Sequence, residues 1–316
     1  MAEKFKKYVI GVDGGGTKTT IALADFQAKI LSFVETGPSN PRNVGILTAA
    51  KNIAEGINKI LKEEKTKKNV FKKGAEITSI FAGLPAIGEE YKSKKSIIKK
   101  EISKRIPRKI SSTIKIGSDQ IVAFRAGTDK KEGVVLIAGT GFSVHGWKKG
   151  KEVKSSGWGW LADEGSAFWT GQRVLRATLK DIDKRLPKNN LTKLVLRKFK
   201  IKEPEELIKE IYQKDFIKKI SSLSVLCGKE AEKANKTAVG ILEKGAEEAG
   251  LSFRAVISGL KFKNKKFPVV LIGSMFESKV FLKKTIFYIK KTAPEAQIIL
   301  LGQKPVIGAV KLAIEN

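Results

Sequence analysis

Short apolar runs alternate with glycines and polar breaks near the start of the chain. The runs cover residues 8–12, 19–24 and 29–34, and several of their apolar positions are β-branched. Runs of this length between turn-forming residues predict β-strands rather than helices. The break from Asp13 to Lys18 is therefore expected to be the turn of a β-hairpin.

The same pattern recurs at the start of the second half of the chain. Residues 133–138 form an apolar run, Gly139-Thr140-Gly141 a glycine turn and residues 142–147 a returning strand. A further hairpin turn is expected at 148–151. Because the two halves open alike, the sequence predicts a duplicated α/β domain.

Elsewhere the apolar spacing alternates between that of helices and that of buried strands. Residues 47–61 place their apolar side chains on one helical face, and 164–262 are expected to be a mostly helical insertion. We predict a first domain at 1–117, with a helix at about 305–316 packing back on it, and a second at 118–304. The other expected elements are strands at 77–82, 113–117, 268–272 and 297–301 and helices after Pro85, at 120–126, at 277–291 and from 305.

Length and composition narrow the class of protein. A chain of 316 residues has room for two domains with cores of their own, and its hydrophobic fraction of 41% is ordinary for a globular protein. No apolar run approaches the roughly 18 residues of a membrane span, and no signal-peptide core precedes the first strand. The single cysteine, Cys227, excludes an intramolecular disulfide. We therefore expect a cytoplasmic protein without a membrane partner.

The formal net charge of +30 raises the question of a nucleic-acid partner. Lysines supply most of the positive charge and are spread over many segments, whereas readout of bases favours arginine. No basic segment carries aromatic residues placed for base stacking. We expect solvated faces and no specific nucleic acid, with non-specific polyanion binding or steering of an anionic substrate as the alternatives.

The first glycine turn carries the most telling chemistry. Three consecutive glycines, at 14–16, suit a backbone that approaches a phosphate closely. Neither G-x-x-x-x-G-K-[ST] nor G-x-G-x-x-G is present, which argues against P-loop and Rossmann enzymes. Asp13 would repel a phosphate unless Mg²⁺ lay between them. The alternative is an aspartate that only forms the turn.

Seven segments, in order along the chain, resemble the N-acetylglucosamine kinase and BadF/BadG/BcrA/BcrD ATPase family, which shares the actin and hexokinase fold. The resemblance implies duplicated actin/hexokinase-like (ribonuclease H-like) ATPase domains, with mixed sheets flanked by helices and the active site in the interdomain cleft. The segments cover residues 11–19, 39–45, 118–119, 134–143, 157–171, 270–276 and 305–309.

The resemblance implies ATP and Mg²⁺ as the cofactors, with Asp13 facing the metal. A solvated Lys18 and a plain hairpin turn at 139–141 are the alternative interpretations of two of these positions. The residues expected to bind the nucleotide and its metal are Asp13, Gly14, Gly15, Gly16, Thr17, Lys18, Gly139, Thr140, Gly141, Gly273 and Ser274.

The resemblance also implies a catalytic base and a sugar site. Asp119 would accept the proton of the sugar hydroxyl, although it could instead cap the helix that follows. Asn40, which could also be a turn residue before Pro41, would bind the sugar. Gly157, Trp158 and Asp163 complete the expected sugar site together with Asn40 and Asp119. The family usually has one more residue before its aspartate, so the position of Asp163 is open.

Three functions compete, and the prediction is an ATP-dependent kinase that converts N-acetyl-D-glucosamine to its 6-phosphate. Glucosamine or a broader range of hexoses are alternative acceptors. A BadF-type ATPase without a sugar acceptor is disfavoured, because the family's iron–sulfur cluster needs two cysteines per subunit and the chain has only Cys227. A non-catalytic scaffold would not need Asp13, Asn40, Asp119 and Asp163 together. A homodimer is left open.

Overall fold

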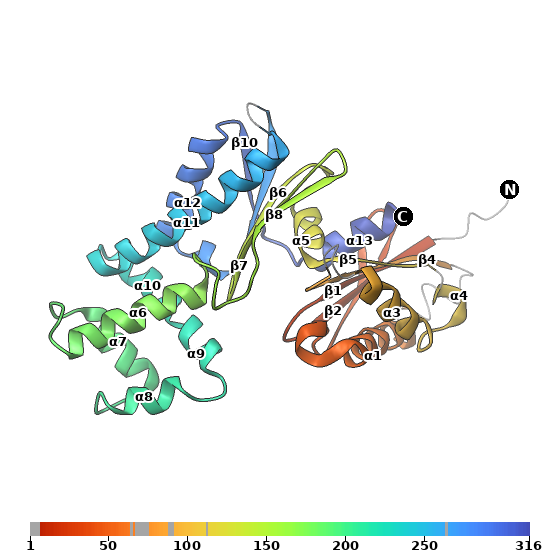
Figure 1. The fold of residues 1–316 in the computed structure, drawn as a ribbon. Coiled ribbons are helices and arrows are strands. Elements are labelled where there is room, and N and C mark those ends of the chain that lie inside the picture. Colours follow the sequence, from red (N-terminus) through yellow and green to blue (C-terminus); the bar gives the residue numbers. More distant parts are fainter. Residues whose placement is uncertain (1–6, 64–65, 67–75, 88–91, 112, 263–264) are drawn as a thin grey trace. The chain divides into compact units, whose positions relative to one another are not determined.

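A computed structural model describes residues 7–63, 66, 76–87, 92–111, 113–262 and 265–316 (Figure 1). Residues 1–6, where we expect no signal-peptide core, lie outside that range. The chain divides into two compact units. The first comprises residues 1–130 and 301–316, and the second comprises residues 131–300. No helix in the described part of the chain has both the length and the apolar character needed to cross a bilayer.

The first unit is built on a five-stranded mixed sheet with the order β3-β2-β1-β4-β5. The first three strands form antiparallel hairpins, and β4 and β5 continue the sheet in parallel. β1 is apolar on both faces because both faces are covered. The strands are β1 (Lys7–Gly14), β2 (Thr19–Asp25), β3 (Ile30–Thr36), β4 (Glu76–Leu84) and β5 (Ile114–Ser118).

Helices cover the two faces of this sheet with separate cores. On one face Ile10 and Ile80 pack with Ile57 of α1 and Ile98 of α3. On the other face Val9 and Phe81 pack with residues of α5 and α13. Alternate side chains of each strand therefore serve opposite cores. The helices are α1 (Pro41–Lys62), α3 (Lys92–Ser103), α4 (Arg108–Ser111), α5 (Asp119–Gly127) and α13 (Val306–Ile314).

The second unit repeats the sheet of the first. Its order is β10-β9-β6-β7-β8, which, counted from β8, again places the third, second, first, fourth and fifth strands side by side. The β6–β7–β8 hairpins are antiparallel, and β9 and β10 are parallel additions. The predicted duplication is thus confirmed at the level of strand order. The strands are β6 (Gly133–Ala138), β7 (Phe142–Lys148), β8 (Lys151–Ser156), β9 (Phe267–Ile272) and β10 (Ala296–Leu300).

A helical layer accounts for much of the second unit. One continuous core joins Leu136 and Val144 of the sheet to Phe253 of α11 and Phe281 of α12. α12 begins two residues later than predicted because Ser278 caps it and a 3₁₀ turn, η3 (Ser274–Glu277), precedes it. The α-helices are α6 (Ala167–Ile182), α7 (Asn190–Phe199), α8 (Glu206–Ile211), α9 (Phe216–Ser221), α10 (Leu223–Glu232), α11 (Lys236–Leu260) and α12 (Lys279–Thr292).

The observed division between the units differs from the expected one at 117/118. Helix α5, expected in the second domain, belongs to the first unit, because it packs on α13 and β4. Arg125 of α5 is only 3% exposed and pairs with Glu315, donating from Nη1 to Oε2 at 2.9 Å. The chain therefore leaves the first unit after α5, and it returns there for α13.

Candidate functional site

The first glycine turn joins β1 to β2 as a hairpin, with Asp13 paired to Thr20 and Gly14 to Thr19 in the register. The carbonyl of Gly15 accepts hydrogen bonds from the backbone N–H groups of Ser39 and Asn40, at 3.0 and 3.1 Å. A side chain at Gly14 would lie 2.4 Å from Ser39 Oγ, so glycine is required there. The turn is thus fastened to the segment that leads into α1.

Asn40 lies at the start of α1, next to this turn. Its Oδ1 accepts a hydrogen bond from Arg42 N at 3.0 Å, which makes it the N-cap of the helix. Asn40 therefore has a local structural role, as its alternative interpretation expected, but that role is helix capping. The cap fixes the Asn40 side chain beside the glycine turn. Capping uses one oxygen and leaves the amide N–H₂ group as a possible donor to a ligand.

Asp13 and Asp119 lie close enough to influence each other. Burial, and after it the charge of Asp119, raises the pKa of Asp13 from its ordinary 3.8 to about 7, while Lys18 opposes the shift. Asp119 begins α5, but the N-cap is Ser118, whose Oγ accepts from Ile121 N at 3.3 Å. The alternative that Asp119 itself caps α5 is therefore wrong. Two neighbouring carboxylates beside a glycine turn form the acidic part of the site.

Lys18, at the end of the same turn, is engaged with a partner. Its Nζ lies 2.6 Å from Oε1 of Glu35 on β3, and both side chains are exposed. This hydrogen bond lowers the pKa of Glu35. Because exposed ion pairs contribute little to stability, Lys18 can exchange Glu35 for another anion at small cost.

The second glycine turn, Gly139-Thr140-Gly141, joins β6 to β7. Two of its carbonyl groups accept hydrogen bonds from backbone N–H groups in the first turn of α6. Ala167 N donates to Gly139 O at 2.7 Å, and Phe168 N donates to Thr140 O at 3.4 Å. If residues 139–141 were only a hairpin turn, the turn itself would be explained. The two hydrogen bonds that join it to the start of α6 would not be.

Gly273 brings the end of β9 against this second turn. Its φ is +119°, and a side chain there would lie 2.3 Å from Ala138 O and 2.9 Å from Gly139 N. Ser274 then starts η3. The structure therefore brings Gly273 next to Gly139, and the shared nucleotide role of Gly273, Ser274 and Gly139 stays a prediction.

We expect Gly273→Ala to damage both stability and nucleotide binding. The φ of +119° and ψ of +159° lie in a region that is essentially confined to glycine and cost alanine about 1–3 kcal/mol, and the added methyl group displaces the second glycine turn. The matched control is Gly240→Ala on an exposed face of α11, where no atom beyond the adjoining backbone of the helix lies within 4 Å of the added carbon. The control should be neutral or stabilising by up to about 1 kcal/mol. Thermal unfolding and a nucleotide titration measure both, and equal behaviour of the two variants would contradict the expectation.

Asp163 is held inside the loop that follows β8. It is 4% exposed, and its Oδ1 accepts from the backbone N–H groups of Gly157 and Trp158, each at 3.0 Å. Its Oδ2 accepts from Gly159 N at 2.9 Å. This carboxylate, expected to face a sugar, is therefore engaged with three backbone amides.

The tryptophans of this region divide into two groups. Trp158 is 79% exposed. Trp160 instead packs edge-on against Phe168 and Phe216, with ring centroids 4.6 and 5.5 Å apart, and Trp169 is buried. Packing therefore accounts for Trp160 and Trp169, whereas the ring of Trp158 is open to solvent and its predicted role in the sugar site stays a prediction.

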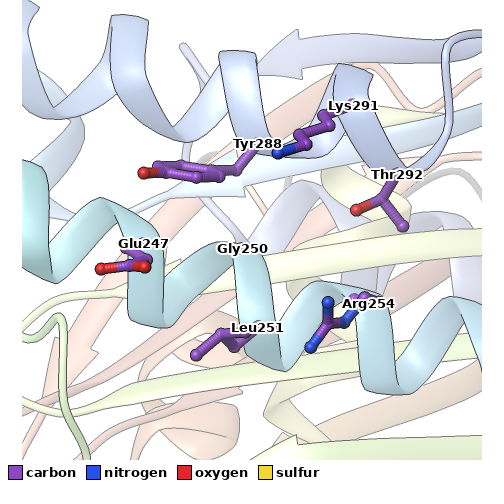
Figure 2. Close-up of a pocket in the computed structure, with 7 residues that line it drawn as sticks. All are labelled: Glu247, Gly250, Leu251, Arg254, Tyr288, Lys291 and Thr292. Atoms are coloured by element: carbon purple, nitrogen blue, oxygen red, sulfur yellow. The ribbon is translucent and has the colours of Figure 1, made fainter.

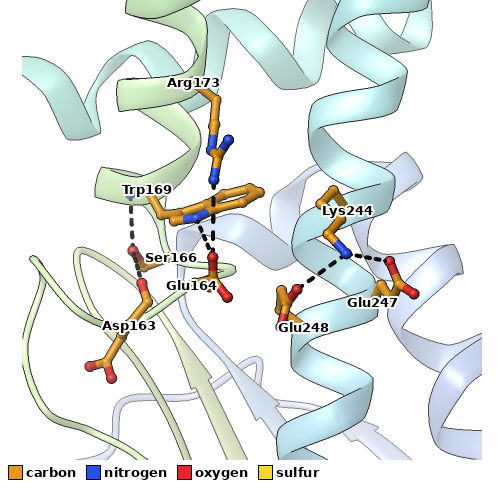
Figure 3. Close-up of polar contacts among 8 residues, drawn as sticks. All are labelled: Asp163, Glu164, Ser166, Trp169, Arg173, Lys244, Glu247 and Glu248. Carbon is orange, nitrogen blue, oxygen red and sulfur yellow. Dashed lines mark hydrogen bonds and ion pairs between the residues drawn. The ribbon is translucent and has the colours of Figure 1, made fainter.

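The residues after Asp163 form a polar cluster that sequence reasoning missed (Figure 3). Trp169 Nε1 donates to Glu164 Oε1 at 3.3 Å, and the Arg173 guanidinium lies over the Trp169 ring, 4.7 Å from a ring centroid. Ser166 caps α6 by accepting from Trp169 N at 3.1 Å. A serine directly before an amphipathic helix was the available signal for this cap.

Two hollows lie on the helical part of the second unit. One, of about 220 Å³, lies between α10 and η3, and Ser274 is among the residues that line it. The other, of about 380 Å³, lies between α11 and α12 and is lined by Arg254, Tyr288 and Lys291 among others (Figure 2). No predicted site residue lines the second hollow. The first is the one that adjoins the predicted nucleotide site.

Two units with the same strand order, each with a glycine turn between its first two strands, give the chain the duplicated α/β fold of the actin and hexokinase class. A model of the BadF/BadG/BcrA/BcrD ATPase family matches residues 10–313, and the chain belongs to that family. The predicted fold class and family are therefore confirmed.

Two curated relatives and one solved structure resemble the chain over nearly its whole length. An N-acetylmuramic acid/N-acetylglucosamine kinase of Clostridium acetobutylicum is 32% identical over 97% of this chain and 98% of its own. An N-acetyl-D-glucosamine kinase of Dictyostelium discoideum is 32% identical over 98% and 99%. A candidate N-acetylglucosamine kinase of Chromobacterium violaceum shares the fold with a TM-score of 0.70, at 20% identity and coverage of 98% and 99%.

Proposed function

We propose that the protein is an ATP-dependent sugar kinase that transfers the γ-phosphoryl group to a hydroxyl of N-acetyl-D-glucosamine, giving the 6-phosphate. The observation that carries this proposal is the pair of neighbouring carboxylates, Asp13 and Asp119, beside a hairpin glycine turn. Kinases need a cation site and a base at the reacting phosphate, and two neighbouring carboxylates can supply both. The names of the two curated relatives support the sugar class.

Asp13 is the residue we assign to Mg²⁺. A partly buried carboxylate whose pKa is raised to about 7 by desolvation and by Asp119 is unfavourable as an anion, and a bound cation removes that penalty. Among the described residues no group of three or more acidic, histidine or cysteine side chains is arranged for a metal. Mg²⁺ suits such a site because it takes one or two carboxylates and completes its shell with phosphate oxygens and water. When bound, it neutralises charge on the transferred phosphate.

The glycine turns and the hollow beside Ser274 are assigned to the nucleotide. Backbone N–H groups of Gly14, Gly15 and Gly16 and the hydroxyl of Thr17 would bind phosphate oxygens, with Lys18 adding a charge. Gly139-Thr140-Gly141 would bind phosphate oxygens from the second unit. The hollow between α10 and η3 would take the base and ribose, next to Gly273 and Ser274.

Asp119 is assigned to the acceptor hydroxyl. The hydroxyl oxygen attacks the γ-phosphorus, the bond from that phosphorus to the bridging oxygen of ADP breaks, and the hydroxyl proton passes to the carboxylate of Asp119. Asn40, Gly157 and Trp158 would bind the remaining face and hydroxyls of the sugar. The exposed ring of Trp158 suits the apolar face of a pyranose.

The cysteine argues against the electron-transfer ATPases of the same family. Cys227 is fully buried in α10, and burial raises the pKa of its thiol to about 12. An iron–sulfur cluster is held by exposed or cluster-facing thiolates, and more than one is required. A protonated, buried thiol is instead a small apolar core residue.

The substrate class is tested by measuring ADP release with N-acetylglucosamine, glucosamine, N-acetylmuramic acid, N-acetylmannosamine, glucose and no sugar. We expect the highest kcat/KM with N-acetylglucosamine and a rate without sugar at least about 100-fold lower, because proton transfer and positioning need the acceptor. Mass analysis of the product identifies the phosphorylated carbon. Sugar-independent ADP release of equal rate would contradict the kinase proposal.

A further inference from the structure

The segment from Asp163 to Phe168 is hydrogen-bonded both to the loop at 157–159 and to the second glycine turn. At its start, the Asp163 carboxylate accepts three hydrogen bonds from the loop at 157–159. At its end, the N–H groups of Ala167 and Phe168 donate to the carbonyls of the second glycine turn. Few residues therefore join the loop proposed for the acceptor to the turn proposed for the donor.

Ser166 stiffens the middle of this segment. Its Oγ donates to Asp163 O at 3.2 Å and accepts from Trp169 N at 3.1 Å, as Figure 3 shows. Both Ser166 and Asp163 are buried. The segment is thus continuous with α6 rather than a flexible connection, so displacement of one end would displace the other.

The loop at 157–159 needs such a restraint. Ser156, Gly157 and Gly159 have φ angles of +62°, +85° and +123°. Glycine adopts such angles readily, but Ser156 carries a side chain and is strained there. The loop also exposes Trp158. Backbone hydrogen bonds from Gly157 N to Phe142 O and from Ala162 N to Gly159 O hold its two ends, whereas the N–H groups of Trp158 and Gly159 donate to the Asp163 carboxylate. A carboxylate that accepts three backbone hydrogen bonds is a strong local restraint, because bonds to a charged acceptor are stronger than neutral ones.

The second turn lies within reach of the same carboxylate. A side chain at Gly141 would lie 3.9 Å from Asp163 Oδ2 and 4.0 Å from Trp160 N. Gly141 has no such carbon, so the turn is a near neighbour of the carboxylate and the loop. The direct link between loop and turn is the hydrogen bond from Gly157 N to the carbonyl of Phe142, the residue that follows Gly141, at 3.0 Å.

We infer that Asp163 is a positioning residue: it fixes the backbone of the 157–159 loop relative to the Gly139–Gly141 turn, and acts on the acceptor through that loop. The inference deepens the proposed function and rests on it. Its main competitor is direct recognition, in which Asp163 accepts a hydrogen bond from a sugar hydroxyl.

Asp163→Asn separates the two roles. Asparagine keeps one oxygen for Gly157 and Trp158 but turns an N–H₂ group toward Gly159 N, where two donors oppose each other. We expect kcat/KM for N-acetylglucosamine to fall at least about 10-fold, as misplaced binding groups commonly cause. The same factor, within about twofold, is expected with the 3-deoxy and 4-deoxy analogues. Loss of the effect with one of these analogues would mean direct contact with the missing hydroxyl and would overturn the inference.

Amide hydrogen exchange in the ligand-free protein gives a second test that needs no activity. The reporting amides are those of Trp158 and Gly159, because the Gly157 N–H also donates to Phe142 O at 3.0 Å. In the wild type, these two amides should exchange at least about 10-fold more slowly than in an unstructured chain. Asp163→Asn should remove that protection, whereas the neighbouring control Glu164→Gln should keep it. Unprotected amides in the wild type would overturn the inference even if the variant failed to fold.

The outcomes distinguish the two proposals. A wild-type protein that phosphorylates no sugar but protects these amides contradicts the proposed function alone. A wild-type protein that phosphorylates sugar, with an Asp163→Asn effect confined to one hydroxyl, contradicts the positioning role alone.

Discussion

Asp119→Asn should lower kcat for sugar phosphorylation by about 10²–10⁴-fold, while the affinity for ATP changes less than about threefold. Asparagine keeps the size and can still bind the hydroxyl, but it cannot take the proton. Removing the charge of Asp119 also lowers the pKa of Asp13, which favours the metal-binding form of that carboxylate. The loss should therefore appear in kcat. Steady-state kinetics and a separate nucleotide titration measure the two quantities.

Asp129→Asn is the matched control for this variant. Asp129 follows the same helix, its side chain is 86% exposed, and it pairs with Lys311 Nζ at 2.8 Å. The same chemical change there should leave kcat within about twofold of the wild type, because the residue is remote from the glycine turn. Near wild-type turnover in Asp119→Asn would show that the base is another residue.

Asp13→Asn should raise stability in the absence of metal and abolish the response to Mg²⁺. Burial and the Asp119 charge raise the pKa of Asp13 from 3.8 to about 7, so between these values the folded protein holds a proton that the unfolded chain has released. Stability therefore falls as pH rises through this window, by at most about 4 kcal/mol. Asparagine carries no such penalty, so the variant should unfold at a higher temperature at pH 8 and at nearly the same temperature at pH 4.

Thermal unfolding at several pH values, with and without Mg²⁺ and ADP, measures this effect. Mg²⁺ with ADP should stabilise the wild type at pH 8 and have little effect on Asp13→Asn. Asp129→Asn is again the control: Lys311 lowers the pKa of Asp129, so its loss should slightly destabilise the protein at neutral pH. A wild-type stability that rose between pH 4 and 7, or an Asp13→Asn variant that responded fully to Mg²⁺, would exclude this role.

The strand pattern was predictable because it depends on local sequence. Apolar runs interrupted by Asp13 to Lys18 and by Gly139 to Gly141 specified both hairpins, and their repetition specified the duplication. The strand order then follows from how such units close, with later strands added in parallel on the far side of the first. The family resemblance supplied the roles of the residues, which strand patterns alone do not.

The side-chain partners were not predictable, because they depend on residues distant in sequence or on loop geometry. Whether Ser118 or Asp119 caps α5 is decided by the φ and ψ angles of adjacent residues, which the pattern does not specify. The three amides around Asp163 converge only because the backbone adopts left-handed angles at 156, 157 and 159. The assignment of α5 to the first unit likewise depends on α13, which lies far along the chain: Arg125 and its partner Glu315 are 190 residues apart.

The return of the chain to the first unit bears on the order in which the protein forms during synthesis. One face of the first sheet is covered by α13, whose Val306, Ala309 and Val310 belong to the core that includes Val9 and Phe81. These residues are translated after the whole of residues 131–300. When residue 300 has been translated, the second unit has all its strands and helices, whereas the first still lacks the part of its core that α13 supplies. The second unit is therefore free to fold first, and the first sheet keeps an apolar face open until α13 emerges.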